Sequence, residues 1–270
     1  MNRRTVLGAA GSLAFGTITV VTAMARSRSD DAFVSAARNG PPAADVVTEQ
    51  LLPETMHETP LYAIEAPSSG PTVMVFGGVH GDEFNGIEVS HEVTDWRPDA
   101  GTLVVVPETN RVAVENEERE GVDGDLNRHF PIDGEPTTEL ARGIWDAVEH
   151  WNPDVVLDLH RSLGIFGLHQ RYVGQALFHS ADAPAKEIVA SLNDVVPWYM
   201  PAHQFVAEPS THPSPLLFKK AAHELGSTAY LFETTSFMLD QETKNEFTRA
   251  ATARVLARHG MLEVSMEVGR

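Results

Sequence analysis

The sequence predicts a single α/β domain with a mixed, largely parallel sheet flanked by helices on both faces. Mostly apolar runs at 73–76, 102–107 and 155–160 are typical of strands buried on both sides. Segments with the helical spacing of apolar residues alternate with these runs, as in chains that cross from strand to strand. With 270 residues and 42% hydrophobic content, the chain can bury one sizeable core.

The expected elements follow in order. A first strand is expected at 61–66, and a turn at 67–71 leads into the strand that contains 73–76 and then a helix ending at Trp96. A final strand is expected at 227–235, and the further helices at 137–151, 185–195, 216–225 and 241–259. The range 108–131 shows no period, and 197–215 carries five prolines and is expected to form a flap over the cleft.

Two candidate metal ligands follow the strand 73–76. His80 and Glu83 come just after its glycine turn, and imidazole and carboxylate groups both suit Zn²⁺. A catalytic zinc takes three protein ligands, and His160 ends another buried run. Because the carboxyl ends of parallel strands meet at one edge of a sheet, these three side chains are expected to hold one zinc ion per chain.

Four short motifs then suggest a family. They are His80-Gly81-Asp82-Glu83, Asp125-Leu126-Asn127-Arg128, Asp158-Leu159-His160 and Glu233-Thr234. In this order they resemble the succinylglutamate desuccinylase/aspartoacylase family of the zinc carboxypeptidase superfamily, over about Thr72 to Phe237. The resemblance implies a zinc-carboxypeptidase-like fold and a zinc-dependent hydrolase of amide bonds.

The resemblance also implies roles in the loop 108–131. Asn127 and Arg128 would hold the substrate carboxylate, and Asp125 would support His80. Arg119 would stabilise the negative charge that develops on the carbonyl oxygen. The spacing from Arg119 to Asp125 is one residue longer than expected, so Arg111 and Arg161 are alternatives for this role.

Glu233 lies near the end of the strand expected at 227–235 and has two interpretations. A carboxylate at that edge could act as the general base beside a zinc-activated water, or it could simply precede the last helix. Position alone does not separate the two. The resemblance, through Glu233-Thr234, favours the catalytic role.

Three functions are compatible with these residues. The first is a deacylase that acts on an N-acyl amino acid or a similar amide with a free carboxylate. The second is an exported zinc carboxypeptidase that acts on peptides, since fuller family members carry a further carboxy-terminal β domain for which this sequence leaves no room. The third is a non-catalytic metal-binding surface protein, against which the presence of Glu233 and the arginines argues.

The net charge of the chain limits the kinds of partner that it can bind. A formal net charge of −18, from 38 acidic and 20 basic residues, argues against a nucleic-acid surface. An acidic, lysine-poor surface is typical of proteins adapted to high salt, although an ordinary acidic protein is the alternative. With no cysteine, the chain has no disulfides and no thiolate ligands. Nothing in the sequence indicates an oligomeric state.

The first residues predict export. Residues 1–25 combine Arg3 and Arg4 with a mildly apolar stretch and a small-residue ending, typical of a twin-arginine leader cleaved after Ala25. An uncleaved membrane anchor is the alternative, but its glycines and threonines make it a poor one. The range 26–44 is expected to be a mobile linker, and 45–270 the zinc-dependent hydrolase domain of an exported, extracytoplasmic or secreted protein.

Overall fold

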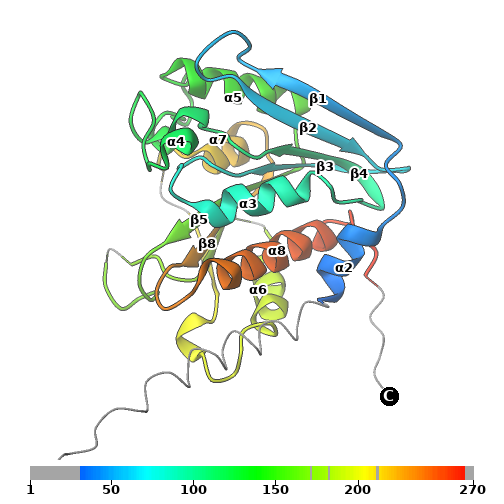
Figure 1. Ribbon diagram of the computed structural model, residues 1–270, viewed down its shortest axis with the longest axis vertical. Helices are drawn as coiled ribbons and strands as arrows, with labels where there is room; N and C mark the ends of the chain where they lie inside the picture. Colours follow the sequence, from blue (N-terminus) through cyan, green and yellow to red (C-terminus); the bar gives the residue numbers. More distant parts are fainter. Residues whose placement is uncertain (1–30, 171, 182, 211–212, 265–270) are drawn as a thin grey trace, which may run out of the picture. The chain divides into compact units, whose positions relative to one another are not determined.

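The structure is a computed structural model, and it describes residues 31–170, 172–181, 183–210 and 213–264 (Figure 1). The predicted leader, 1–25, lies outside the described residues, as does the start of the predicted linker. A compact unit begins at Ala32. None of the helices among the described residues is both long and apolar enough to cross a bilayer.

The described residues form the strands β1 Asp45–Leu51, β2 Thr59–Glu65, β3 Ser68–Phe76, β4 Ala100–Val106, β5 Val155–Ser162, β6 Ala176–His179, β7 Val206–Pro209 and β8 Thr228–Thr235. The helices are α2 Ala32–Asn39, α3 Phe84–Val93, α4 Arg111–Asn116, α5 Glu139–Trp151, α6 Ala185–Asn193, α7 Leu217–Glu224 and α8 Gln241–Arg258. Two short 3-10 turns, η2 Leu126–Arg128 and η3 Pro201–His203, lie in the connections.

The strands pair into one eight-stranded sheet in the order β1-β2-β4-β3-β5-β8-β6-β7. Its centre is parallel, since β3 pairs in parallel with β4 and β5, and β5 pairs in parallel with β8. Antiparallel pairing joins β2 to β4, β1 to β2 and β6 to β8. The fold class predicted from the sequence, a mixed and largely parallel sheet, is confirmed.

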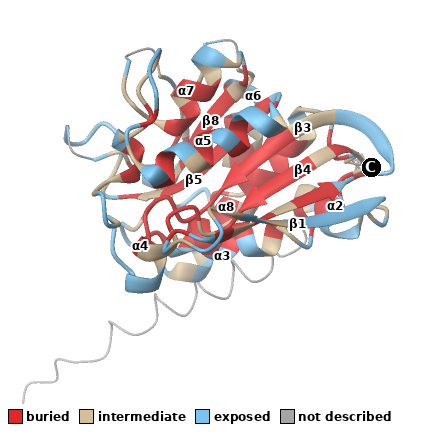
Figure 2. Cartoon of the chain, turned by 90° about the horizontal axis from the view of Figure 1, so that it is seen from above, coloured by how far each residue is buried: buried red, intermediate tan, exposed pale blue. Residues whose placement is uncertain are grey.

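Helices cover both faces of the sheet, each with its own apolar layer. One layer contains buried residues of α2, α3, α6 and α8, and the other contains those of α5 and α7. Figure 2 shows the central strands buried between these helices. The parallel strands therefore lie between two apolar layers, as their unbroken apolar sequences require.

The segment 32–39 differs from its prediction. It was expected to belong to a mobile linker, but it forms α2, with Val34 and Ala37 buried in the layer shared with α3 and α8. The Phe33 ring lies 4.4 Å from the guanidinium of Arg254 on α8. The prediction is wrong here because eight residues are too few to display a clear period, while burial against α8 stabilises the helix.

Three strands were missed, and two predicted loops contain regular structure. β1 was not predicted, nor was the four-residue β6. The predicted flap 197–215 contains η3 and β7, and β7 extends the sheet beside β6. The predicted irregular loop 108–131 contains α4 and η2. The turn predicted at 67–71 is instead the start of β3, which begins at Ser68. The other predicted strands and helices agree with the structure to within a few residues of their ends.

Candidate metal centre and active site

The turn after β3 presents two of the candidate ligands. Gly78 has a φ of +66°, a left-handed conformation that favours glycine. A Cβ atom on Gly81 would lie 1.9 Å from the carbonyl oxygen of Ala113, so only glycine fits between this turn and α4. The turn can therefore pack against α4 and hold His80 and Glu83 at the carboxyl edge of the sheet.

The predicted ligands come together at that edge. The Nδ1 atom of His80 lies 2.9 Å from Glu83 Oε1, and the Nδ1 atom of His160 lies 2.8 Å from Glu83 Oε2. The two Nδ1 atoms are 3.2 Å apart, and all three side chains are buried. β3 and β5 are adjacent and parallel, which explains why residues so distant in the sequence meet. The structure thus confirms the predicted convergence of His80, Glu83 and His160.

The other nitrogen of each imidazole faces a carboxylate. His80 Nε2 lies 3.1 Å from Asp125 Oδ1, and His160 Nε2 lies 2.9 Å from Asp158 Oδ2. If each Nε2–H donates to its carboxylate, each Nδ1 keeps a lone pair directed at the shared centre. Two such nitrogens and one carboxylate are the donor set that a catalytic zinc takes, so the residues fit this metal.

The protonation of these side chains follows from their contacts. Burial raises the pKa of Glu83, but attraction to His160 and His80 outweighs burial and holds this pKa below its ordinary value. Burial lowers the pKa of His80, yet its hydrogen bonds to Asp125 and Glu83 leave that pKa raised. Glu83 therefore stays ionised, and its negative charge attracts a metal cation to the cluster.

Asp158 is a site residue that the sequence analysis did not assign. It is fully buried, and besides accepting from His160 it accepts a hydrogen bond of 3.2 Å from Asn127 Nδ2. Alternation along a strand places residues two apart on the same face, so the spacing of Asp158 and His160 within β5 was the available signal. Asp158 supports His160 in the way that Asp125 supports His80.

Asn127, which was predicted to hold the substrate carboxylate, faces the protein interior in the structure. Its side chain is buried, with its amide nitrogen on Asp158 and its Oδ1 accepting the backbone N–H of Leu217 at 3.1 Å. Leu217 begins α7, where backbone N–H groups have no partner within the helix. Asn127 thus joins η2 to α7 and supports the ligand shell, because its hydrogen-bonding groups are directed into the protein.

The candidate arginines differ in whether their side chains contact the ligand cluster. Arg119 donates to Glu83 Oε1 at 3.1 Å and to Asp125 Oδ2 at 3.3 Å, so it lies at the cluster. Arg111 instead pairs with Glu108, which precedes α4, and with Glu115 on α4. Of the candidates for stabilising a carbonyl oxygen, Arg119 has its guanidinium at the ligands.

Arg161 and Arg128 differ from Arg119 in where their side chains point. Arg161 pairs through its guanidinium with Asp82, and only its backbone N–H reaches Glu83, at 3.0 Å. Arg128 has a side chain 57% exposed and lies 3.5 Å from Asp125. Its Nη1 donates to the carbonyl oxygen of Asn127 at 2.7 Å, so the guanidinium is held on the loop while more than half of the side chain is exposed to solvent.

Glu233 lies beside His160. The two residues are direct partners in the parallel pairing of β5 and β8, and Glu233 Oε2 is shielded from water with no hydrogen-bond partner among the described residues. Burial raises the pKa of Glu233 to about 8, with the positive charge of His160 opposing the shift and the negative charge of Glu83 adding to it. A carboxyl group with such a pKa suits a residue that takes up a proton and returns it.

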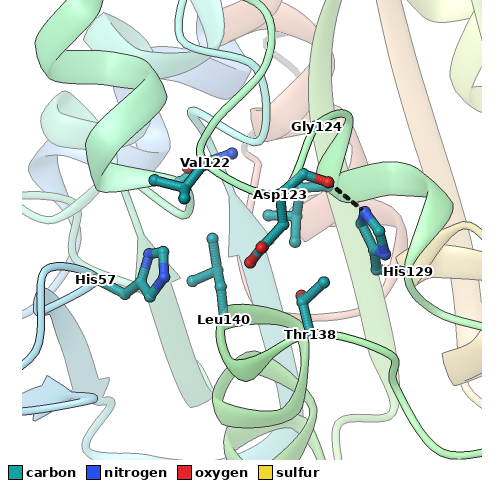
Figure 3. A pocket seen from close by; sticks show the side chains of 9 residues that line it. His57, Val122, Asp123, Gly124, His129, Thr138 and Leu140 are labelled. Carbon is teal, nitrogen blue, oxygen red and sulfur yellow. Dashed lines mark hydrogen bonds between the residues drawn. The ribbon is translucent and has the colours of Figure 1, made fainter.

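A small pocket lies under the loop that carries the arginines (Figure 3). His57, Asp123, Thr138 and His129 are among the residues that line it, and the ligand cluster does not contribute. The His129 ring donates to the carbonyl oxygen of Asp123 at 2.9 Å and contacts Thr137 at 2.6 Å. These bonds of His129 hold the segment that leads to Asp125.

The sequence is similar to those of a known enzyme family. Residues 69–202 match the family described as the succinylglutamate desuccinylase/aspartoacylase catalytic domain. This part of the chain belongs to that family. The family match includes His80, Glu83, Asp125 and His160, while Glu233 lies beyond it.

A relative of known activity is an N-alpha-acetyl-L-2,4-diaminobutyric acid deacetylase of Halomonas elongata. It is 36% identical over 97 residues, which are 34% of this chain and 28% of the deacetylase. The chain therefore spans little more than a quarter of that relative. Together with the family match, the deacetylase shows that this chain is related to amide hydrolases.

Solved structures share the fold. The cell shape determinant Csd4 of Helicobacter pylori, as its Gln46His variant, has a TM-score of 0.64 at 19% identity, covering 77% of this chain and 57% of Csd4. A succinylglutamate desuccinylase/aspartoacylase of Rhodobacter sphaeroides has a TM-score of 0.58 at 18% identity, covering 86% of this chain and 70% of that chain. At these identities the likeness establishes the fold shared with aspartoacylase-family proteins.

Proposed function

We propose that the protein is a zinc-dependent deacylase that hydrolyses the amide bond of an N-acyl amino acid. The observation that carries this proposal is the buried cluster of His80, Glu83 and His160, with each imidazole backed by a carboxylate. The family match and the related deacetylase support an amide as the substrate. When bound by the three side chains, zinc supplies Lewis-acid activation of water and of the carbonyl group.

The roles of the other residues follow from their positions. Glu233 accepts a proton from the attacking water and returns it to the leaving nitrogen, so the C–N bond is replaced by a C–O bond and the products are a carboxylate and an amine. Arg119, at the cluster, stabilises the negative charge that develops on the carbonyl oxygen. Arg128, largely exposed beside Asp125, holds the substrate carboxylate.

A second candidate is hydrolysis of a peptide at its carboxyl end. Csd4, which shares the fold, has also been solved with a tripeptide bound, covering 77% of this chain at a TM-score of 0.63. A peptide offers the same amide and carboxylate groups as an N-acyl amino acid. The two substrate classes therefore use the same roles for Glu233 and Arg128.

A turnover screen tests the proposal. The zinc-loaded protein is incubated with N-acyl amino acids and with short peptides in molar salt, and release of free amine is measured. We expect hydrolysis of N-acyl amino acids that stops after zinc is chelated and returns when zinc is restored. Arg128→Ala should raise KM more than it lowers kcat, because the contact exists in both ground and transition states. Turnover of peptides alone would favour the second candidate, and turnover of neither class would contradict both.

We also propose that the protein is exported by the twin-arginine route and is adapted to high salt. Export rests on the leader 1–25 and salt adaptation on the net charge of −18. Fractionation of expressing cells, with Arg3 and Arg4 both changed to lysine as a control, tests the first. Retention of the unchanged protein in the cytoplasm would contradict export.

A further inference from the structure

Exposed apolar side chains gather beside the candidate active site. Among the described residues, thirteen large apolar side chains are exposed, and six of them lie on the loops that follow β5 and β8. We name these six the apolar rim: Leu163, Phe166, Leu168, Tyr172, Phe237 and Met238. Exposed apolar residues scattered singly need no explanation, but a cluster of this kind marks a binding surface.

The two loops form one structure. Thr235, the last residue of β8, donates its hydroxyl hydrogen to the carbonyl oxygen of Gly164 at 2.6 Å, and Ser236 N–H donates to Ser162 O at 3.0 Å. The first loop folds back on itself, because Gly174 N–H donates to Leu163 O at 3.2 Å. Both loops lie together beyond the ends of β5 and β8, in green and orange at the left of Figure 1.

The rim continues directly from the candidate catalytic residues. Leu163 follows His160 by three residues, and Phe237 follows Glu233 by four. At about 3.3 Å for each extended residue, each lies at most about 10 to 13 Å along the chain from its catalytic neighbour. That distance suits the length of a small substrate that reacts at the cluster.

The rim and the arginines lie on opposite sides of the cluster. Arg119 and Arg128 lie at Asp125, which contacts His80 after β3. The rim belongs to the loop from β5 to β6 and to the loop from β8 to α8. In the strand order β3-β5-β8, the arginines therefore lie on the side of β3 and His80, and the rim on the side of β5 and β8.

Charge distinguishes the rim from the rest of the protein. Acidic residues make up 38 of the 270 residues, yet none occurs in 163–174. The second loop has none until Asp240, which caps α8. Apolar side chains are therefore the main feature of these two loops, and Arg171 is the one Lys or Arg in 163–174.

We propose that the apolar rim receives the acyl group of the substrate, so that the preferred substrates are N-acyl amino acids with an apolar acyl chain of several carbons. This inference rests on the proposed deacylase function. A substrate with its carboxylate at Arg128 and its amide at the cluster extends its acyl group toward the opposite side, where the rim lies. An acetyl group is too short to cover the rim, and a succinyl group would bring a carboxylate to an apolar surface.

A chain-length series tests this inference. The zinc-loaded full chain is assayed with N-acetyl, N-butanoyl, N-hexanoyl and N-octanoyl derivatives of L-alanine and L-glutamate. We expect kcat/KM to rise with acyl length, by at most about fourfold for each CH₂ group that becomes buried. The double variant Leu163→Ser/Met238→Ser should lower kcat/KM for the octanoyl substrate far more than for the acetyl substrate.

The control is Met56→Ser, the same change at an exposed methionine far from the rim. Met56 is 61% exposed and lies between β1 and β2, at the other end of the sheet from the rim. It should leave the dependence on acyl length unchanged. Hydrolysis of N-acetyl substrates with a flat or falling dependence on acyl length would overturn the inference and leave the proposed function standing. An unchanged dependence in the double variant would also overturn it. Hydrolysis of no N-acyl amino acid would instead overturn the proposed function.

Discussion

Asp158 and Asn127 determine the orientation of the His160 imidazole. The Asp158 carboxylate accepts from both side chains, and the Asn127 amide nitrogen also lies 3.2 Å from His160 Nε2. Residues that orient a metal-binding imidazole in this way set its tautomer and its basicity. The affinity for metal therefore depends on residues that do not touch the metal.

Asp158→Asn tests this dependence. The substitution keeps the size of the side chain but removes the charge that holds the proton on His160 Nε2. We expect zinc affinity to fall by about 10- to 100-fold, measured by competition with a chromogenic chelator. Asp123→Asn, at an exposed position two residues before Asp125, is the control and should bind zinc normally. Equal zinc affinity in both variants would contradict the role of Asp158.

Glu233→Gln tests the proton transfer. Glutamine keeps the shape of the side chain but cannot accept a proton, so kcat should fall by roughly 10² to 10⁴. Zinc content and KM should barely change, because Glu233 is not one of the clustered ligands. Glu242→Gln, at an exposed position in the first turn of α8, is the matched control. Near-native turnover of Glu233→Gln with zinc bound would assign the proton to another residue.

At the scale of elements, α2 ties the start of the described chain to the helical layer. Arg38 pairs with Glu92 on α3 at 2.8 Å, and the carbonyl oxygen of Ala37 accepts from Arg97 N–H at 2.7 Å. With Val34 buried beneath, the helix contributes to the same core as α8. A segment that resembles a linker in sequence is thus part of the domain.

Val34→Ala measures that contribution. The change removes two methylene equivalents from a buried position, so the free energy of unfolding should fall by about 1.5 to 2.5 kcal/mol. Chemical denaturation followed by circular dichroism provides the measurement. The control Ser35→Ala, exposed on the same helix, should change it by less than about 0.5 kcal/mol. If Val34→Ala were as stable as the control, α2 would not be packed in solution.

At the scale of the whole molecule, the net negative charge influences the stability of the fold. With a net charge of −18 on 270 residues, the acidic side chains repel one another, and salt screens that repulsion. The Debye length falls from about 30 Å at 0.01 M salt to about 3 Å at 1 M. Stability should therefore depend on ionic strength more than in a protein with balanced charge.

Melting temperature should rise between about 0.01 M and 1 M potassium chloride, because screening relieves repulsion that is larger in the folded state than in the extended chain. Differential scanning calorimetry provides the measurement. Sodium chloride is the control for an effect of one particular cation and should give the same rise. A flat or falling melting temperature would contradict adaptation to salt.

Much of the candidate site was predictable from the sequence. His80, Glu83 and His160 follow glycine turns or end apolar runs, and parallel strands deliver such residues to one edge whatever surrounds them. The apolar runs of β3, β4 and β5 likewise required burial on both faces, which predicted the layered fold. These inferences succeed because they depend on local pattern and on the direction of the chain.

Other features depend on contacts between distant segments. β1 is exposed along most of its length and has no apolar pattern, so only its pairing with β2 makes it a strand. Asn127 lies beside Arg128 in a motif that suggests a substrate contact, yet the position of α7 turns its side chain inward. Tertiary structure alone also brought the loops after β5 and β8 together. A polar or apolar residue in a loop can face solvent or protein, and the packing of the whole chain decides which.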